Sequence, residues 1–315
     1  MDIGFPNLGI SFANVPVYLI GTDPGRALIP LPFPFDVYMY GASIVLAIAL
    51  AALLAFWGAR ASGQRVADYA DLAIVGLPLA IVGLRLYYVA FNWEQFRGQG
   101  FLQIFVFGIR GGGLAIFGGI IGAAAAAAIV GARKNIPFGL IADTGAPSML
   151  LGQAIGRWGN FFNREAHGGY SDGLLAMQIR YEDARHVTQE LRETALVYVD
   201  GARYLQVHPT FLYESALNFA LMAALLWYRP RKRFDGEIVL LYFLGYGVIR
   251  FFVEGLRADQ MALGNTGLPL NQVTAALFAG ASLALLAAGR RKAAAKKPGK
   301  KPGKKSGKKS GKKPE

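Results

Sequence analysis

Residues 156–165 read Gly-Arg-Trp-Gly-Asn-Phe-Phe-Asn-Arg-Glu, and they close a long apolar run that begins near Leu140. Such a run is typical of a membrane-spanning helix, in which a central arginine costs about 2.5–3.5 kcal/mol to insert. Asn160 follows Arg157 by three residues and Asn163 follows by three more, so a helix places all three on one face. A guanidinium beside two amides suits a phosphate or a carboxylate. The stretch therefore predicts either an anion-binding site within the membrane or an arginine that ties helices together.

The composition favours a membrane protein. Of 315 residues, 54% are hydrophobic and only 17% are charged, which is too apolar for an ordinary soluble domain. From Arg290 onward, 13 Lys and Arg accompany one acid, Glu315, so this stretch holds +12 of the net charge of +13. Its Lys-Lys repeats with Pro-Gly or Ser-Gly predict that residues 290–315 form a disordered tail. We expect the tail to anchor at anionic lipid headgroups, and we expect no nucleic-acid partner.

The chain contains no cysteine and only three histidines, His167, His186 and His208. A disulfide, a thiolate metal site and a cysteine nucleophile are therefore excluded. The histidines show no paired metal-ligand spacing, and the sequence has no Gly-x-Ser-x-Gly elbow. We expect neither a metal nor a cofactor.

Seven apolar stretches are long enough, or nearly so, to span a membrane as helices. They lie at Val37–Phe56, Leu72–Phe91, Gly111–Val130, Leu140–Phe162, Pro209–Tyr228, Ile238–Phe252 and Leu268–Leu286. The sixth is short unless it continues through Arg257. The predicted fold class is an all-α integral membrane protein with about seven transmembrane helices and a small head region on the outer face.

The spans divide the chain into segments. Residues 1–36 form an extra-membrane segment, because Pro30, Pro32 and Pro34 preclude a helix there. Residues 37–289 form the seven-helix domain, in which the hydrophilic stretch 163–207 is the head.

Lys and Arg concentrate in alternate loops, which predicts that these loops share the cytoplasmic face. The loops contain Arg60, Arg65, Arg133, Lys134, Arg229, Arg231, Lys232 and Arg233. The rule places the N-terminus outside, the C-terminus in the cytoplasm and residues 163–207 outside. Arg157, at the outer end of the fourth span, then lies in the outer half of the membrane.

The sixth span contains a second polar stripe, with spacings that place its members on one side of a helix. They are Tyr246, Arg250, Glu254 and Arg257. A structural Arg–Glu pair would satisfy itself, whereas the second arginine leaves a surplus positive charge, to which Arg157 and Arg85 add. Because every arginine within the membrane is costly, an anionic ligand explains the stripe better than packing does.

Two further segments allow alternative interpretations. The glycines from Gly111 to Gly122, followed by six alanines, either let helices pack closely or expose backbone N–H groups to a ligand. In the fifth span, Glu214 lies just inside the membrane and needs a cationic or hydrogen-bonding partner. His208 is either an interfacial cap or a site residue, and Tyr40 is either an interfacial aromatic or a phenol that reaches the site.

Together these segments resemble the prolipoprotein diacylglyceryl transferase family of bacteria. Residues 156–168, Gly-Arg-Trp-Gly-Asn-Phe-Phe-Asn-Arg-Glu-Ala-His-Gly, are similar to the family signature. Supporting similarities lie at Asp143–Pro147, Gly112–Gly119, His208–Glu214 and Tyr246–Arg257, and the resemblance extends from about Tyr40 to Leu286.

The resemblance implies two substrates, phosphatidylglycerol and a prolipoprotein signal peptide with a lipobox cysteine. The diacylglyceryl group moves to the cysteine sulfur, which gives a thioether and releases glycerol 1-phosphate in the first step of bacterial lipoprotein maturation. The implied location is the bacterial cytoplasmic (inner) membrane. A transporter or channel for an anionic solute and a scaffold that only binds anionic lipid are the alternatives, although no duplicated pair of interrupted helices supports a transporter.

The resemblance also implies residue roles. Arg157, Arg250 and Tyr246 are the expected catalytic residues, with Arg157 also contacting the lipid headgroup. The other expected substrate-binding residues are Tyr40, Gly118, Gly119, Asn160, Asn163, Glu165, Gly168, His208, Glu214, Glu254 and Arg257. This chain departs from the family at Phe117, where many members carry a histidine. Phenylalanine cannot accept a proton, so a general base at that position is not expected here, and Tyr246 or His167 is the candidate relay.

Overall fold

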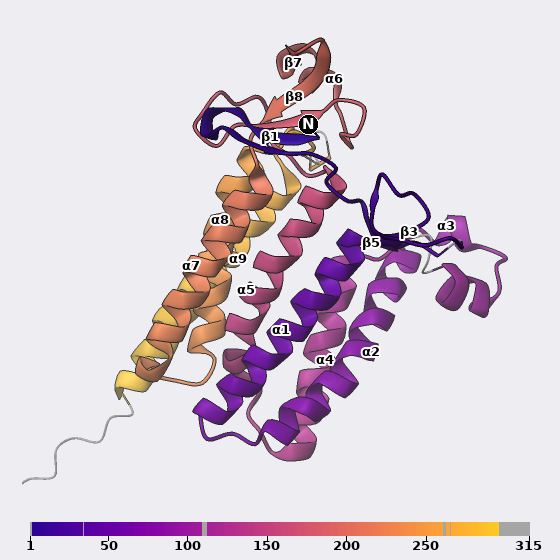
Figure 1. Ribbon diagram of the computed structural model, residues 1–315. Helices are drawn as coiled ribbons and strands as arrows, with labels where there is room; N and C mark the ends of the chain where they lie inside the picture. Colours follow the sequence, from indigo (N-terminus) through magenta and orange to yellow (C-terminus); the bar gives the residue numbers. More distant parts are fainter. Residues whose placement is uncertain (1, 34, 109–111, 261–262, 265, 296–315) are drawn as a thin grey trace, which may run out of the picture.

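The computed structural model describes residues 2–33, 35–108, 112–260, 263–264 and 266–295. Long helices run side by side in a bundle, and a small head lies at one end of it (Figure 1). Most of the predicted Lys-rich tail, from residue 296 onward, lies outside the described residues.

Seven long helices of the described chain build the bundle. They are α1 (Met39–Ala61), α2 (Val66–Phe91), α4 (Ile116–Lys134), α5 (Phe138–Asn163), α7 (Thr210–Tyr228), α8 (Glu237–Gly255) and α9 (Leu270–Ala295). Among these described helices, all except α5 are long and apolar enough to cross a membrane. The 26-residue α5 is long enough as well, but it contains most of the polar residues of the predicted signature. The prediction of a helical membrane protein with about seven spans is therefore confirmed.

The helix boundaries differ from the prediction where glycine or polar residues intervene. The third span was expected to begin at Gly111, which lies outside the described residues, but α4 begins at Ile116. Gly112 and Gly113 have φ angles of +92° and +70°, a left-handed conformation that glycine adopts readily but that a helix cannot contain. At the other end of the chain, α9 continues to Ala295, past the predicted start of the tail at residue 290.

The head is built around a β-sheet, although the predicted fold class named only helices. Five strands have the order β2-β1-β6-β8-β7. They are β1 (Ile3–Phe5), β2 (Ile10–Phe12), β6 (Met177–Arg180), β7 (Leu196–Val199) and β8 (Ala202–Val207). Ile3 of β1 pairs with Ile179 of β6 in antiparallel register, so the N-terminal segment and residues 163–207 share one sheet. A short helix, α6 (Gln189–Thr194), completes this region.

A second, smaller sheet connects the head to the bundle. It has the order β4-β3-β5 and consists of β3 (Tyr18–Gly21), β4 (Ala27–Pro30) and β5 (Val37–Tyr38). The connection from α2 to α4 contains α3 (Trp93–Phe96) and the π-helix η2 (Gln103–Phe107), and α3 lies near the smaller sheet (Figure 1).

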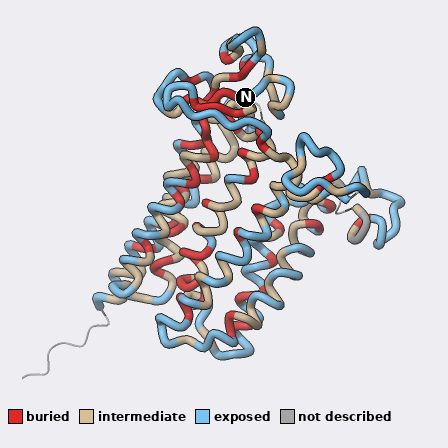
Figure 2. Tube along the Cα trace, in the orientation of Figure 1, coloured by how far each residue is buried: buried red, intermediate tan, exposed pale blue. Residues whose placement is uncertain are grey.

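The head packs directly on the bundle. Ile3, Leu205 and Val207 are fully buried in the sheet, and they belong to the same apolar cluster as Phe161 of α5 and Phe211 of α7. Figure 2 shows buried residues in the sheet that continue into the helices beneath it. Since α5 also contacts α1, α7 and α8, the segment 156–165 lies at the junction of the bundle and the head.

Candidate functional site

Glu214 of α7 is the centre of a polar cluster at the head end of the bundle. It is only 1% exposed, and its carboxylate accepts hydrogen bonds from three side chains on two other helices. Arg157 Nη2 of α5 lies 2.7 Å from Oε1, and the Tyr246 hydroxyl of α8 donates to the same oxygen at 3.2 Å. Arg250 Nη1 of α8 lies 3.2 Å from Oε2. Glu214, which was expected to need a cationic or hydrogen-bonding partner, is thus paired with two arginines.

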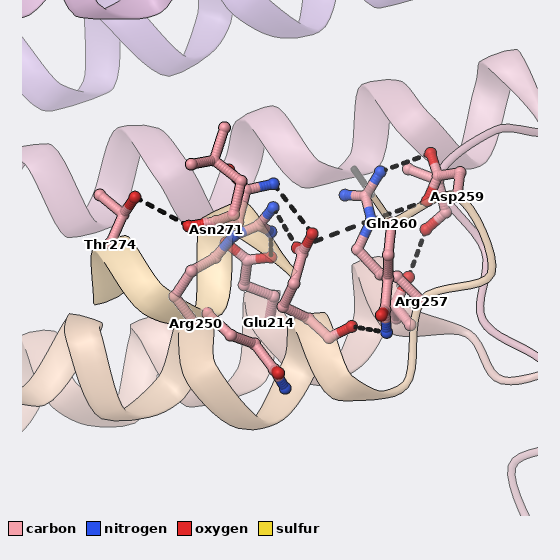
Figure 3. Close-up of polar contacts among 12 residues, drawn as sticks. Glu214, Arg250, Arg257, Asp259, Gln260, Asn271 and Thr274 are labelled. Carbon is pink, nitrogen blue, oxygen red and sulfur yellow. Dashed lines mark hydrogen bonds and ion pairs between the residues drawn. The ribbon is translucent and has the colours of Figure 1, made fainter. Parts of the chain in front are cut away.

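The polar stripe on α8 continues from this centre toward the end of the helix (Figure 3). Arg250 Nη2 lies 2.5 Å from a carboxylate oxygen of Glu254, which is 1% exposed. Arg257 donates to both carboxylate oxygens of Asp259, with Nε at 2.9 Å and Nη2 at 2.7 Å. Asn271 of α9 donates to Glu254 at 2.8 Å. The structure therefore brings the predicted stripe together with Arg157.

The amides of the signature hold the end of α5 in a defined shape. Asn160 and Asn163 both donate to Glu165 Oε1, at 3.1 and 3.2 Å. This carboxylate reaches them because Arg164 adopts the left-handed conformation, with φ of +53°, and turns the chain back over the helix end. Asn160 Oδ1 also lies 3.5 Å from Arg157 Nη1. Glu165 thereby fixes the amides that flank the arginine.

Tyr40 lies beside this segment. A Cβ added at Gly159 would lie 2.7 Å from the Tyr40 ring, so the glycine leaves the space that the ring occupies. The ring of Tyr40, near the start of α1, is thus placed against the same turn of α5 that carries Arg157 and Asn160.

The base of the head closes over the cluster through the backbone of Gly168 and His208. Gly168 N–H donates to the His208 carbonyl at 2.9 Å, and Gly169 N–H donates to the Leu256 carbonyl at the end of α8, also at 2.9 Å. Burial lowers the pKa of the His208 imidazole, whose Nδ1 lies 3.3 Å from the Tyr213 hydroxyl. Gly168 and His208 therefore have a structural role in joining head and bundle.

His167, a candidate relay, points into the head. Burial lowers the pKa of its imidazole, and Nε2 lies 3.1 Å from the Arg185 carbonyl, which it reaches as a donor. Of the two candidate relays, only Tyr246 contacts the arginine cluster in the described part of the chain.

Gly118 and Gly119 lie elsewhere, on the face of α4 that packs against α2. A Cβ at Gly118 would overlap the carbonyl of Gly83, and a Cβ at Gly119 would overlap Leu84. Close helix packing, one of the two interpretations of the glycine run, accounts for both residues. The described residues include no contact between these glycines and Arg157 or Arg250.

Arg85 also lies apart from the cluster. Its guanidinium donates to the carbonyls of Ile104, Gly112 and Gly113, each at 2.9 Å, and so holds the connection before α4. It does not add to the charge around Arg157.

The predicted surplus of positive charge is wrong. Three arginines, Arg157, Arg250 and Arg257, are paired with three carboxylates, Glu214, Glu254 and Asp259. Glu214 comes from another helix and Asp259 from the loop beyond α8, so the spacing within the stripe does not reveal either of them as a partner of the arginines. These three pairs are formally neutral, and an anion would compete with Glu214 for the two arginines.

Two residues of the cluster, Asp259 and Asn271, were not predicted from the sequence. Asn271 could have been predicted, because a polar residue in the first turn of an apolar helix indicates a polar partner.

Among the described residues, no three His, Asp or Glu side chains converge as metal ligands would.

Comparison with known proteins gives a consistent result. A family model described as prolipoprotein diacylglyceryl transferase matches residues 26–288. The chain is 42% identical over 252 residues to a protein of Bacillus cereus (strain Q1), covering 78% of this chain and 86% of that protein. It is 42% identical over 235 residues to a protein of Bacillus anthracis (strain CDC 684 / NRRL 3495), covering 73% and 80%. Both relatives are named phosphatidylglycerol–prolipoprotein diacylglyceryl transferase.

Proposed function

Because the chain belongs to the prolipoprotein diacylglyceryl transferase family, we propose that it transfers the diacylglyceryl group of phosphatidylglycerol to the lipobox cysteine of a prolipoprotein signal peptide. The predicted family and transferase class are confirmed, and the transporter and the non-catalytic scaffold are set aside. The cysteine sulfur attacks the glycerol carbon that carries the phosphate ester. A C–S bond forms and the C–O bond to the phosphate breaks, so glycerol 1-phosphate leaves with the electron pair of that bond. The thiol proton passes to the released phosphate or to solvent. The attacking thiol belongs to the peptide, so an enzyme without cysteine can catalyse the step.

One observation supports the choice of catalytic residues: two arginines from different helices contact a single buried carboxylate, that of Glu214. A phosphate that replaced this carboxylate would receive charge-assisted hydrogen bonds from both guanidiniums. Negative charge grows on the phosphate as the C–O bond breaks, so the two arginines stabilise the transition state more than the ground state. Arg157 and Arg250 are the proposed catalytic residues.

The remaining residues position these two. The Tyr246 hydroxyl donates a hydrogen bond to the same oxygen of Glu214 that Arg157 contacts. We assign Tyr246 a catalytic role at the phosphate. Glu254 holds the second nitrogen of Arg250, while Glu165 holds the amides next to Arg157. We propose that Tyr40, Asn160, Asn163, Gly168, His208 and Arg257 shape the surroundings of the bound lipid headgroup.

The direct test is turnover by the purified chain. With labelled phosphatidylglycerol and a lipobox peptide, we expect the peptide to gain the mass of a diacylglyceryl group and glycerol 1-phosphate to appear in equal amount. A peptide whose cysteine is replaced by serine is the matched control. Tight lipid binding without any transfer to the cysteine peptide would contradict the proposal.

From the basic loops we also propose an orientation, with the head outside a bacterial cytoplasmic membrane and the C-terminus inside. Since the chain lacks cysteine, the labelling of single introduced cysteines can determine this orientation. Ser62, after α1, and Asp172, in the head, are both exposed. We expect an impermeant thiol reagent to label Asp172→Cys in intact cells and Ser62→Cys only after the membrane is opened. Labelling of both from the outside would contradict this orientation.

Phe117 gives a second test of the chemistry. It lies on α4, is 44% exposed, and its ring centroid is 6.1 Å from that of Tyr87. If this position performs no proton transfer here, Phe117→Leu should change the transfer rate only slightly, and Phe117→His should be tolerated. General acid–base groups contribute about a hundredfold or more. A loss of that size in Phe117→Leu, with the protein still folded, would show that the position takes part in the reaction.

A further inference from the structure

A cavity of about 330 Å³ lies at the end of the bundle opposite the head, between α1, the start of α5 and the end of α7. Trp57, Leu140 and Leu226 form an apolar wall, and Arg229 and Lys232 add two basic groups. Arg229 begins the short 3-10 helix η4 (Arg229–Arg231) that follows α7. The cavity is distinct from the arginine cluster, because Thr144 in its wall and Arg157 are 13 residues apart on α5, about 20 Å along the helix.

Arg229 is the unusual residue of this cavity. Its Nη2 donates to the Gly58 carbonyl at 2.8 Å and to Thr144 Oγ1 at 3.2 Å, which are both neutral acceptors. No carboxylate of the described residues forms an ion pair with it, and in this part of the chain Nε and Nη1 have no acceptor. A partly buried guanidinium that contacts no carboxylate can still accept an anionic partner, so the position favours an anion.

The other charged groups in the cavity already contact partners of their own. Lys232 Nζ lies 2.9 Å from Asp143 and 2.8 Å from Asp235. Asp143 also accepts hydrogen bonds from the backbone N–H groups of Gly236, Ile238 and Val239 at the start of α8. Asp143 is therefore held by Lys232 and by the start of α8, and it forms no ion pair with Arg229.

The surroundings of the cavity indicate which anion it takes. Trp57 is 56% exposed, and the neighbouring Trp227 is 68% exposed, with the Arg231 guanidinium 4.3 Å above its ring. Exposed tryptophans next to arginines at the end of apolar helices mark a lipid headgroup region. Basic pockets between transmembrane helices on the cytoplasmic side are suited to anionic headgroups. We propose that this cavity binds the phosphate headgroup of an anionic phospholipid from the leaflet opposite the head, with Arg229 as its ligand.

Lipid retention by the purified full-length chain tests this site. The probe is phosphatidylglycerol in nanodiscs of phosphatidylcholine, with bound lipid counted by native mass spectrometry. We expect Arg229→Gln to lower the apparent affinity at this site about tenfold or more, as the loss of a charge-assisted hydrogen bond predicts. Arg231→Gln is the matched control, because Arg231 lies on the same short helix but outside the cavity, and it should retain the lipid. The catalytic site is intact in both variants, so their difference reports the cavity alone.

A second variant keeps the test decisive if Arg229→Gln folds poorly. Ala61→Phe places a ring at the cavity wall, leaves Arg229 intact and should also lose the bound lipid. Equal retention by the wild type, Arg229→Gln and Ala61→Phe would overturn the proposal. Displacement of the lipid by inorganic phosphate at equal concentration would assign the site to free phosphate and overturn the lipid assignment.

Discussion

Arg157→Ala and Arg250→Ala should each slow transfer to the lipobox peptide by at least about a hundredfold, the effect of removing one donor from an oxyanion hole. Both guanidiniums lie at the carboxylate that a phosphate would replace, so each loss leaves part of the developing charge unpaired. Lysine keeps the charge but loses the planar fork, and we expect Arg157→Lys and Arg250→Lys to restore only part of the rate. The measurement is the transfer rate in detergent, with thermal stability recorded for every variant.

The control for these substitutions is Arg180→Ala. Arg180 is a half-exposed arginine of the head sheet that pairs with Glu182. Its loss should leave the transfer rate unchanged, since surface ion pairs contribute little. A wild-type rate in Arg157→Ala, or an equal loss in Arg180→Ala, would remove the catalytic assignment.

Replacing Glu214 should destabilise the protein strongly, and phosphatidylglycerol should restore part of the lost stability. Glu214 is buried, and its removal leaves Arg157 and Arg250 close together without their shared counter-ion. Breaking a buried pair in this way costs about 3–5 kcal/mol. Glu214→Gln preserves the shape and removes the charge. If a phosphate binds where the carboxylate lies, phosphatidylglycerol should raise the melting temperature of Glu214→Gln more than that of the wild type.

Glu237→Gln provides the comparison for Glu214→Gln. Glu237 is likewise fully buried, but it lies at the other end of α8 and pairs with Arg290 at 2.7 Å. We expect a similar loss of stability without added stabilisation by phosphatidylglycerol. Equal rescue of both variants would mean that the lipid does not act at the Arg157–Arg250 pair.

The features that the sequence predicted correctly are local ones. The apolar runs and the spacing from Tyr246 to Arg257 lie within single helices, where periodicity determines the exposed face. The head sheet could not be predicted in this way, because Ile3 pairs with Ile179 across most of the chain. The neutral charge of the cluster depends on a carboxylate from α7, so only the packed structure reveals it. Gly118 and Gly119 illustrate the same limit, since a glycine run fits either close packing or a ligand until the neighbouring helix is known.

A double-mutant cycle of Arg157→Ala and Arg250→Ala tests most directly whether the two arginines act on one phosphate. The transfer rate is measured for the wild type, both single variants and the double variant under identical lipid and peptide concentrations. Groups that share one ligand are not additive, so the double variant should lose clearly less than the product of the two single losses. Strictly multiplicative losses would show that the two arginines serve separate sites and would contradict a shared phosphate.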